Sequence, residues 1–158
     1  MTVALLPPKM DFVFKRIFGN ENHPNVLISF LNAILNPVDP IKSVILKDTT
    51  IEKSHLEDKY SRLDVKAITN KGEYINIEIQ LKDEYNMIKS SLYYWSKLYE
   101  GQLENGENYQ KLSRTICINL LDFNLLNHTK FHSVYRLKDC ETNEELTDVM
   151  EVHFIELK

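Results

Sequence analysis

The chain has 158 residues, of which 43% are hydrophobic and 27% are charged. This is the composition of an ordinary globular domain, and it excludes an intrinsically disordered chain, which would combine low hydrophobicity with high charge. The net charge of −4 excludes attraction of nucleic acid by overall charge, so any such contact requires a local basic patch.

The first part of the chain is predicted to form two helices and a strand. Apolar residues recur at helical spacing over residues 10–18. A second apolar stripe begins after Pro24, which suits a helix N-terminus, and ends at Asn36. From Ile41 onward the apolar positions follow a β pattern.

The second part is predicted to contain a helix between strands. Residues 84–100 have helical periodicity. The apolar stripe of this helix, which is expected to face the core, consists of Ile88, Leu92, Trp95 and Tyr99. Strands are predicted over residues 63–69, 73–81, 114–121, 131–137 and 149–157. This order of helices and strands predicts an α/β (α+β) domain built on a mixed sheet.

The cysteines and the apolar segments bear on the compartment. Cys117 and Cys140 have no Cys or His partners at the spacing of a zinc site, and a reducing cytoplasm is the simplest setting for them. The apolar run at residues 3–6 is too short for a signal peptide, and no later segment approaches a membrane span. We therefore expect a cytoplasmic protein with no membrane association.

The loop between residues 63–69 and 73–81 fixes which side chains meet across the predicted hairpin. A three-residue loop at residues 70–72 pairs Thr69 with Glu73, and the same register pairs Asp64 with Glu78. The β-carbons of such a pair lie roughly 5 Å apart. Opposed carboxylates repel each other unless a cation or a shared proton relieves them, and Mg²⁺ is commonly held by one or two carboxylates.

Gln80 lies two residues beyond Glu78 and therefore shares its face of the strand. A polar face of this kind is also typical of the solvated side of an antiparallel sheet. Periodicity alone favours that second interpretation, so a more specific signal is needed to assign a metal site.

Several motifs supply that signal. Asp64, Gly72 and the run Ile77-Glu78-Ile79-Gln80 resemble the D…ExQ variant of the PD-(D/E)XK nuclease motif, in which glutamine replaces the usual lysine. The surrounding segments are similar to the recombination-promoting nuclease and transposase family, namely DFVFKRIFG at 11–19, FLNAIL at 30–35, Asp58-Lys59, YYWSKLYEGQL at 93–103 and VHFIELK at 152–158. The resemblance implies a restriction-endonuclease-like mixed β-sheet core flanked by helices. It also implies that residues 1–158 form one nuclease-like domain, the N-terminal part of a longer chain.

The resemblance further implies a catalytic and metal site. Asp64 and Glu78 would be metal ligands, the backbone carbonyl of Ile79 would complete the protein ligands, and Gln80 would take the place of the lysine that orients or activates water. The implied metal is Mg²⁺, with Mn²⁺ as a possible substitute. The implied activity is that of a metal-dependent DNA endonuclease associated with recombination or mobile elements.

Five residues are candidates for contacts with nucleic acid. Lys89 stands where many relatives have an arginine, which keeps the charge but loses the bidentate grip on phosphate. The other four candidates are Lys15, Lys59, Arg62 and Tyr93. Each has a simpler alternative, since lysines and arginines are commonly solvated surface cations and aromatic residues at helical spacing commonly pack in a core.

Two other functions remain open from the sequence. A catalytically inactive nuclease-fold module could act through nucleic-acid or protein binding, because glutamine cannot serve as a base. A plain interaction domain would leave the carboxylate face solvated and without metal. The sequence is also compatible with a homo-oligomer and does not distinguish DNA from RNA.

Overall fold

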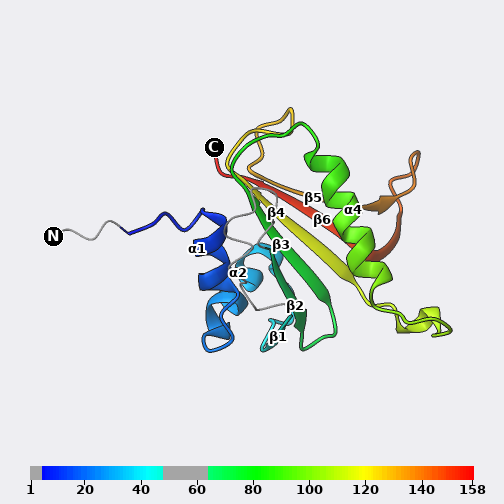
Figure 1. Cartoon of the computed structure of the whole chain (residues 1–158). Coiled ribbons are helices and arrows are strands. Elements are labelled where there is room, and N and C mark those ends of the chain that lie inside the picture. Colours follow the sequence, from blue (N-terminus) through cyan, green and yellow to red (C-terminus); the bar gives the residue numbers. More distant parts are fainter. Residues whose placement is uncertain (1–4, 48–63) are drawn as a thin grey trace.

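A computed structural model of the chain describes residues 5–47 and 64–158, which form a six-stranded mixed sheet in the order β1-β2-β3-β4-β6-β5 (Figure 1). The elements are α1 (Asp11–Phe18), α2 (Pro24–Leu35), β1 (Val44–Lys47), β2 (Val65–Thr69), β3 (Tyr74–Gln80), α4 (Met87–Glu100), the 3₁₀ turn η1 (Tyr109–Lys111), β4 (Thr115–Leu121), β5 (His132–Lys138) and β6 (Glu145–Glu156). The mixed sheet confirms the predicted α/β class. Within the two described ranges, no helix combines the length and apolar character needed to cross a membrane.

Helices α1 and α2 pack on one face of the sheet through the apolar positions that the sequence predicted. Pro24 occupies the first turn of α2, and Asn36 ends the helix with a left-handed backbone (φ 42°). Leu27 and Leu31 of α2 are fully buried against the isoleucines of β3 and β4. Each such side chain stabilises the fold by about 1.5–3 kcal/mol relative to an exposed one. The predicted helices over residues 10–18 and 24–36 are therefore confirmed.

The β2–β3 hairpin has the predicted register. The backbone N–H of Thr69 donates to the carbonyl of Glu73 at 3.0 Å, and Gly72 donates back to Thr69 at 2.9 Å. Gly72 has a φ of 78°, a conformation that glycine adopts at little cost. Pairing continues through Val65 opposite Ile77. The loop thus fixes the alternation of side chains along both strands.

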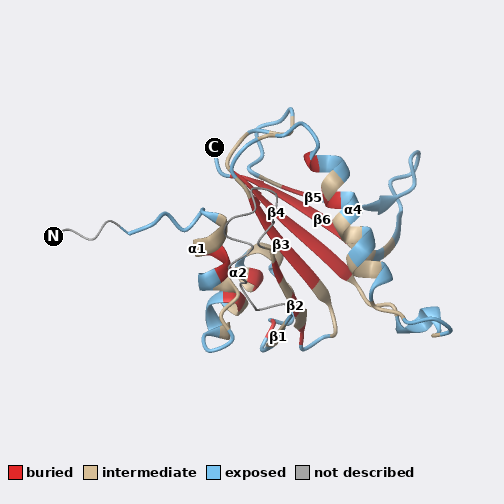
Figure 2. Cartoon of the chain, viewed as in Figure 1, coloured by how far each residue is buried: buried red, intermediate tan, exposed pale blue. Residues whose placement is uncertain are grey.

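The central strands have an apolar face and a more polar face. On β3, the side chains of Ile75, Ile77 and Ile79 belong to the core under α1 and α2. The alternate side chains, Asn76, Glu78 and Gln80, therefore face the other side of the sheet. Strand β4 runs parallel to β3 and also to β6, so strands from distant parts of the sequence form the middle of the sheet, where burial is greatest (Figure 2).

Helix α4 crosses the second face of the sheet (Figure 1), but its core-facing stripe differs from the predicted one. It begins at Met87, three residues later than predicted, and Met87 and Ser91 are buried. Ile88 and Leu92 are 48% and 44% exposed, so their predicted core positions are wrong. The buried stripe of α4 therefore runs through Met87 and Ser91, one position away from the predicted one at Ile88 and Leu92.

Trp95 and Tyr99 pack as predicted. The Trp95 indole donates to the carbonyl of Thr115 at 2.8 Å, and its ring stacks on Tyr99 with a centroid distance of 4.8 Å. The side-chain amide of Gln102 donates to the hydroxyl of Thr115 at 2.6 Å. The C-terminal half of α4 is therefore fixed to the start of β4.

The remaining differences from the predicted elements lie at strand ends. Strand β1 begins at Val44 instead of Ile41, because both backbone groups of Ile41 are bound by the Asn32 side chain on α2. Strands β5 and β6 form the predicted C-terminal hairpin, and their register shifts between Tyr135 and Lys138. The extra residues lie on β6, where the stretch from Thr147 to Val152 faces only Tyr135 to Leu137 of the edge strand β5.

A buried cluster of charged groups joins β4, β5 and β6. Glu151 is 3% exposed and one carboxylate oxygen accepts from Arg114 and Arg136, each at 2.6 Å. The other oxygen lies 2.6 Å from Nε2 of His153, whose Nδ1 lies 2.8 Å from Nε2 of His132. Burial alone would raise the pKa of Glu151, but His153 and Arg114 lower it from 4.5 to about 2.

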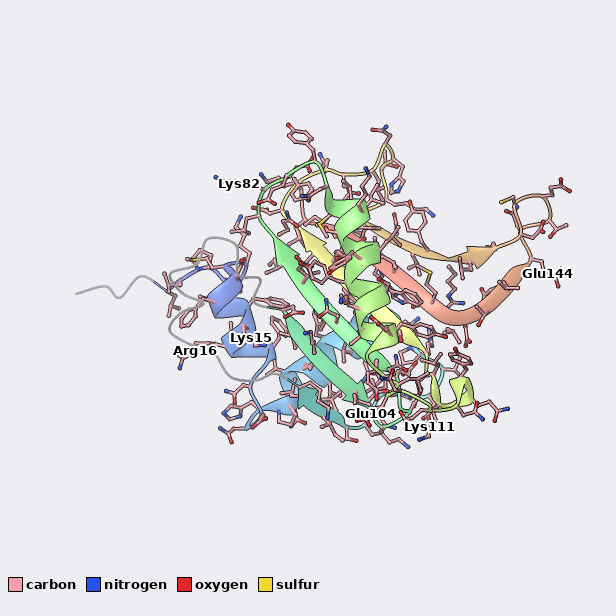
Figure 3. All side chains as sticks on the ribbon, turned by 45° about the vertical axis from the view of Figure 1, so that its right-hand side comes forward. Lys15, Arg16, Lys82, Glu104, Lys111 and Glu144 are labelled. Carbon is pink, nitrogen blue, oxygen red and sulfur yellow. The ribbon has the colours of Figure 1, made fainter. Side chains whose placement is uncertain are left out.

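This cluster predicts acid sensitivity. A carboxyl whose folded-state pKa is lowered stabilises the protein above its unfolded pKa near 4.5, and this contribution is lost as the pH falls toward 2. Glu151→Gln should reduce the free energy of unfolding at pH 7 by about 3 kcal/mol, because two arginines lose their partner. Between pH 5 and pH 3, wild type should lose more stability than Glu151→Gln in urea denaturation. Parallel losses in both proteins would contradict the assignment, and Glu144→Gln on the exposed hairpin tip (Figure 3) is the control.

Candidate active site

Asp64 and Glu78 lie at the end of the β2–β3 hairpin that is remote from its loop. Asp64 immediately precedes β2, and continuing the pairing of Val65 with Ile77 by one residue places it opposite Glu78. Glu78 is 4% exposed, whereas Asp64 is half-buried. The register therefore agrees with the predicted pairing, while the metal-binding roles of both residues stay predictions.

A buried thiol on β4 lies near both acids. Cys117 is buried and lies opposite Asn76 on the parallel neighbour strand. Burial raises its pKa to about 12, with further contributions from the negative charges of Glu78 and Asp64. Because Cys117 pairs with Asn76, it lies on the α4 side of the sheet, as Glu78 does by the alternation along β3.

Gln80 presents an unusual acceptor on the same face. Its side-chain oxygen Oε1 is buried, and no hydrogen-bond partner for it is found within the described structure. A buried polar atom without a partner costs about 1–3 kcal/mol, so it calls for an explanation. A water or another donor held beside Glu78 would satisfy this oxygen.

The donor atoms fit a hard divalent cation. The two carboxylates and the Gln80 amide offer oxygen only, which Mg²⁺ prefers. Ile79 has its side chain in the opposite core, so its contribution to such a site must come from its backbone. Among residues 5–47 and 64–158, no group of three or more His, Cys, Asp or Glu side chains is arranged to hold a metal. A site here would therefore be completed by water or substrate oxygens.

Lys15 of α1 binds the backbone of Asp64. Its side chain is 5% exposed, and its ammonium donates to the backbone carbonyl of Asp64 at 2.6 Å. Figure 3 shows Lys15 on the side of α1 toward the sheet and Arg16 on the outer side. The alternative of a solvated surface cation is therefore wrong for Lys15. The Lys15 ammonium binds the backbone beside the acids. Its predicted contact with nucleic acid stays a prediction.

Two of the other four predicted nucleic-acid contacts lie on α4. Lys89 and Tyr93 are exposed on α4, and the Lys97 ammonium lies 5.9 Å from the centre of the Tyr93 ring. Lys59 and Arg62 lie outside the described residues. The predicted contacts of all four with nucleic acid stay predictions.

The structure contains a basic cleft that was not predicted from the sequence. It has a volume of about 420 Å³ and lies between the β2–β3 hairpin and the second half of α4, with Asp64 in its lining. Lys66 is 3.8 Å from the Asp64 carboxylate, and Lys47 and Lys97 also line the cleft. Two signals could have found it. Lys66 shares the strand face of Asp64, and Tyr94, Lys97, Leu98 and Gly101 have the i, i+3, i+4, i+7 spacing of one helix face.

Comparison with known proteins identifies a similar family. The family model described as PD-(D/E)XK nuclease family transposase matches residues 8–158, from before α1 to the end of the chain. Neither the curated proteins nor the solved structures include a match. The family match agrees with the resemblance carried by the D…ExQ motif.

The paired acids predict stabilisation by divalent metal. A cation that binds only the folded state raises stability, and at roughly 100 times Kd the melting temperature should rise by about 5–10 °C. Mg²⁺ or Mn²⁺ should produce this shift in wild type and in Glu144→Gln, which removes a remote exposed carboxylate. Asp64→Asn should show a much smaller shift in differential scanning fluorimetry. Equal shifts in all three proteins would indicate non-specific ion effects.

The Lys15 contact predicts a second effect on metal binding. Lys15→Met removes the donor to the Asp64 carbonyl, which should lower the free energy of unfolding by about 1–3 kcal/mol. It should also weaken the metal-induced shift, because the backbone of one ligand is no longer held. Arg16→Met, which changes the exposed neighbouring cation, is the matched control. A metal titration of Lys15→Met that overlays the wild-type curve would refute the positioning role.

Proposed function

Because the chain belongs to the family described as PD-(D/E)XK nuclease family transposase, we propose that it is a metal-dependent endonuclease that hydrolyses DNA phosphodiester bonds during recombination or the movement of mobile elements. The observation that carries the proposal is the placement of three oxygen-bearing side chains on one face of the hairpin. Asp64 and Glu78 supply two carboxylates, and Gln80 supplies a buried amide oxygen that lacks a partner in the described structure.

Asp64 and Glu78 would hold Mg²⁺, with Mn²⁺ as a substitute and the Ile79 carbonyl as a further ligand. A metal bound there would polarise the scissile phosphate and lower the pKa of the attacking water. The low exposure of Glu78 strengthens its electrostatic interaction with a cation, since fewer waters screen it. Two carboxylates on a rigid hairpin also keep their separation without a loop having to move.

Gln80 has a different role from the acids. An amide can hold a water through hydrogen bonds, but it cannot accept the proton of that water. We assign it the orientation of the attacking water through Oε1, which is already desolvated. Lys15 would act as a positioning residue, because it binds the backbone of Asp64 and not its carboxylate.

Substitutions in the hairpin test the proposal by cleavage of supercoiled plasmid with and without Mg²⁺. Asp64→Ala and Glu78→Gln should each abolish metal-dependent nicking, because the first removes a ligand and the second replaces a charged ligand with a neutral amide. Gln80→Ala should retain part of the rate, with a loss on the order of a hundredfold, as for one preorganised hydrogen-bond partner. Gln80→Lys, which restores the commoner residue of the superfamily, should keep or raise the activity.

Two controls make the outcome interpretable. Glu144→Ala removes an exposed carboxylate at the β5–β6 hairpin tip (Figure 3) and should cleave as wild type does. Far-ultraviolet circular dichroism and melting temperatures verify that the variants are folded, which matters for the buried Glu78. Cleavage that survives Asp64→Ala and Glu78→Gln would place the activity elsewhere. Absence of cleavage in wild type would favour a nuclease-fold binding module.

A further inference from the structure

The cleft beside Asp64 has the size and the walls of a ligand site. Its volume of about 420 Å³ lies within the range of small-molecule pockets, which is roughly 300–1,000 Å³. Strands β2 and β3 form one wall, and the α4 residues Tyr94, Lys97 and Leu98 form the other. Ile68 and Leu98 give it apolar surface, so it is not merely a solvated groove between charges.

The described lining of the cleft is basic, although the chain as a whole is acidic. The chain has a net charge of −4, whereas among residues 5–47 and 64–158 three lysines, Lys47, Lys66 and Lys97, line the cleft with one carboxylate, that of Asp64. Lysines gathered around a cavity raise the local concentration of anions even on an acidic protein. The cleft is thus the kind of local basic patch that contact with a phosphate backbone requires.

Asn76 supplies the observation that points to a specific ligand. Its side chain is 4% exposed and lines the cleft, and its oxygen Oδ1 is buried with no hydrogen-bond partner among the described residues. An N–H donor from a ligand would satisfy this oxygen, and phosphate alone has none to offer. Nucleobases carry such donors on their edges, and their faces stack on aromatic rings such as those of Tyr74 and Tyr94.

We propose that this cleft is a nucleotide-binding subsite, in which a nucleotide unit adjoining the cut phosphate places its base against Asn76 and its phosphate among Lys47, Lys66 and Lys97. The choice of a nucleotide as the ligand rests on the proposed function. Asp64 connects the two sites, because it lines the cleft and is also a proposed metal ligand. The base would be bound by the Asn76 amide and by an aromatic ring, and the phosphate by lysines, so both parts of a nucleotide are required.

Binding without metal tests the subsite separately from cleavage. The probe is a fluorescein-labelled DNA hexamer, measured by anisotropy in EDTA so that no hydrolysis takes place. Lys97→Gln should weaken binding several-fold and reduce the dependence of log Kd on log salt by about 0.7, as expected for one contact to a single strand. Lys138→Gln is the matched control, because it removes an exposed lysine of β5 that does not line the cleft.

A second variant tests the contact to the base. Asn76→Leu should weaken binding of the hexamer by about two- to tenfold, the range of one hydrogen bond, and should leave binding of an abasic hexamer unchanged. A deoxynucleoside monophosphate that competes with the hexamer at low micromolar concentration would identify the free nucleotide as the ligand, whereas competition only by oligonucleotides supports a unit of a strand.

The outcomes separate the subsite from the catalytic proposal. Loss of binding in Lys97→Gln and Asn76→Leu, with the metal-induced rise in melting temperature intact, supports the subsite whether or not plasmid is cut. Binding by Lys97→Gln and Asn76→Leu equal to that of Lys138→Gln overturns it, even if plasmid cleavage depends on Asp64 and Glu78. Equal weakening of normal and abasic hexamers by Asn76→Leu would also overturn the contact to the base.

Discussion

The register of the β2–β3 hairpin is the constraint on which the candidate site depends. Side chains alternate along a strand, so a shift of one residue would send the opposed acids to different faces of the sheet. The short loop ending at Gly72, with its positive φ, prevents such a shift. The isoleucines of β3 add a second constraint, because a slip of one residue would move them from the core under α1 and α2 to the face that now holds Asn76 and Glu78. The same packing that stabilises the core therefore determines where Glu78 points.

The sequence predicted those features that depend on local periodicity and turn chemistry. The hairpin, α1 and α2 follow from alternation, from helical spacing and from Pro24 and Asn36 at the ends of α2. The stripe of α4 could not be obtained in this way. The buried pair Met87 and Ser91 fits a helical period as well as Ile88 and Leu92 do, and the packing of α4 on the sheet decides between the two stripes.

The candidate site also contains features that the sequence predicted and features that it did not. Opposition of Asp64 and Glu78 follows from counting residues around a short loop, whereas the cleft requires α4 to lie over two strands distant from it in the sequence. The contact of Lys15 is an example of a feature that local sequence patterns cannot predict. Its position on an amphipathic helix cannot reveal that its ammonium reaches the backbone before β2, because that contact joins residues 49 positions apart.

The two edges of the sheet have a consequence for self-association. Open sheet edges invite other strands to pair with them, and proteins commonly avoid this with short edge strands or bulges. Here β1 has four residues, and the pairing of β5 with β6 shifts register between Tyr135 and Lys138. Within residues 5–47 and 64–158, neither edge is both long and regularly paired with its neighbour. The fold therefore resists growth by strand addition and the aggregation that such growth produces.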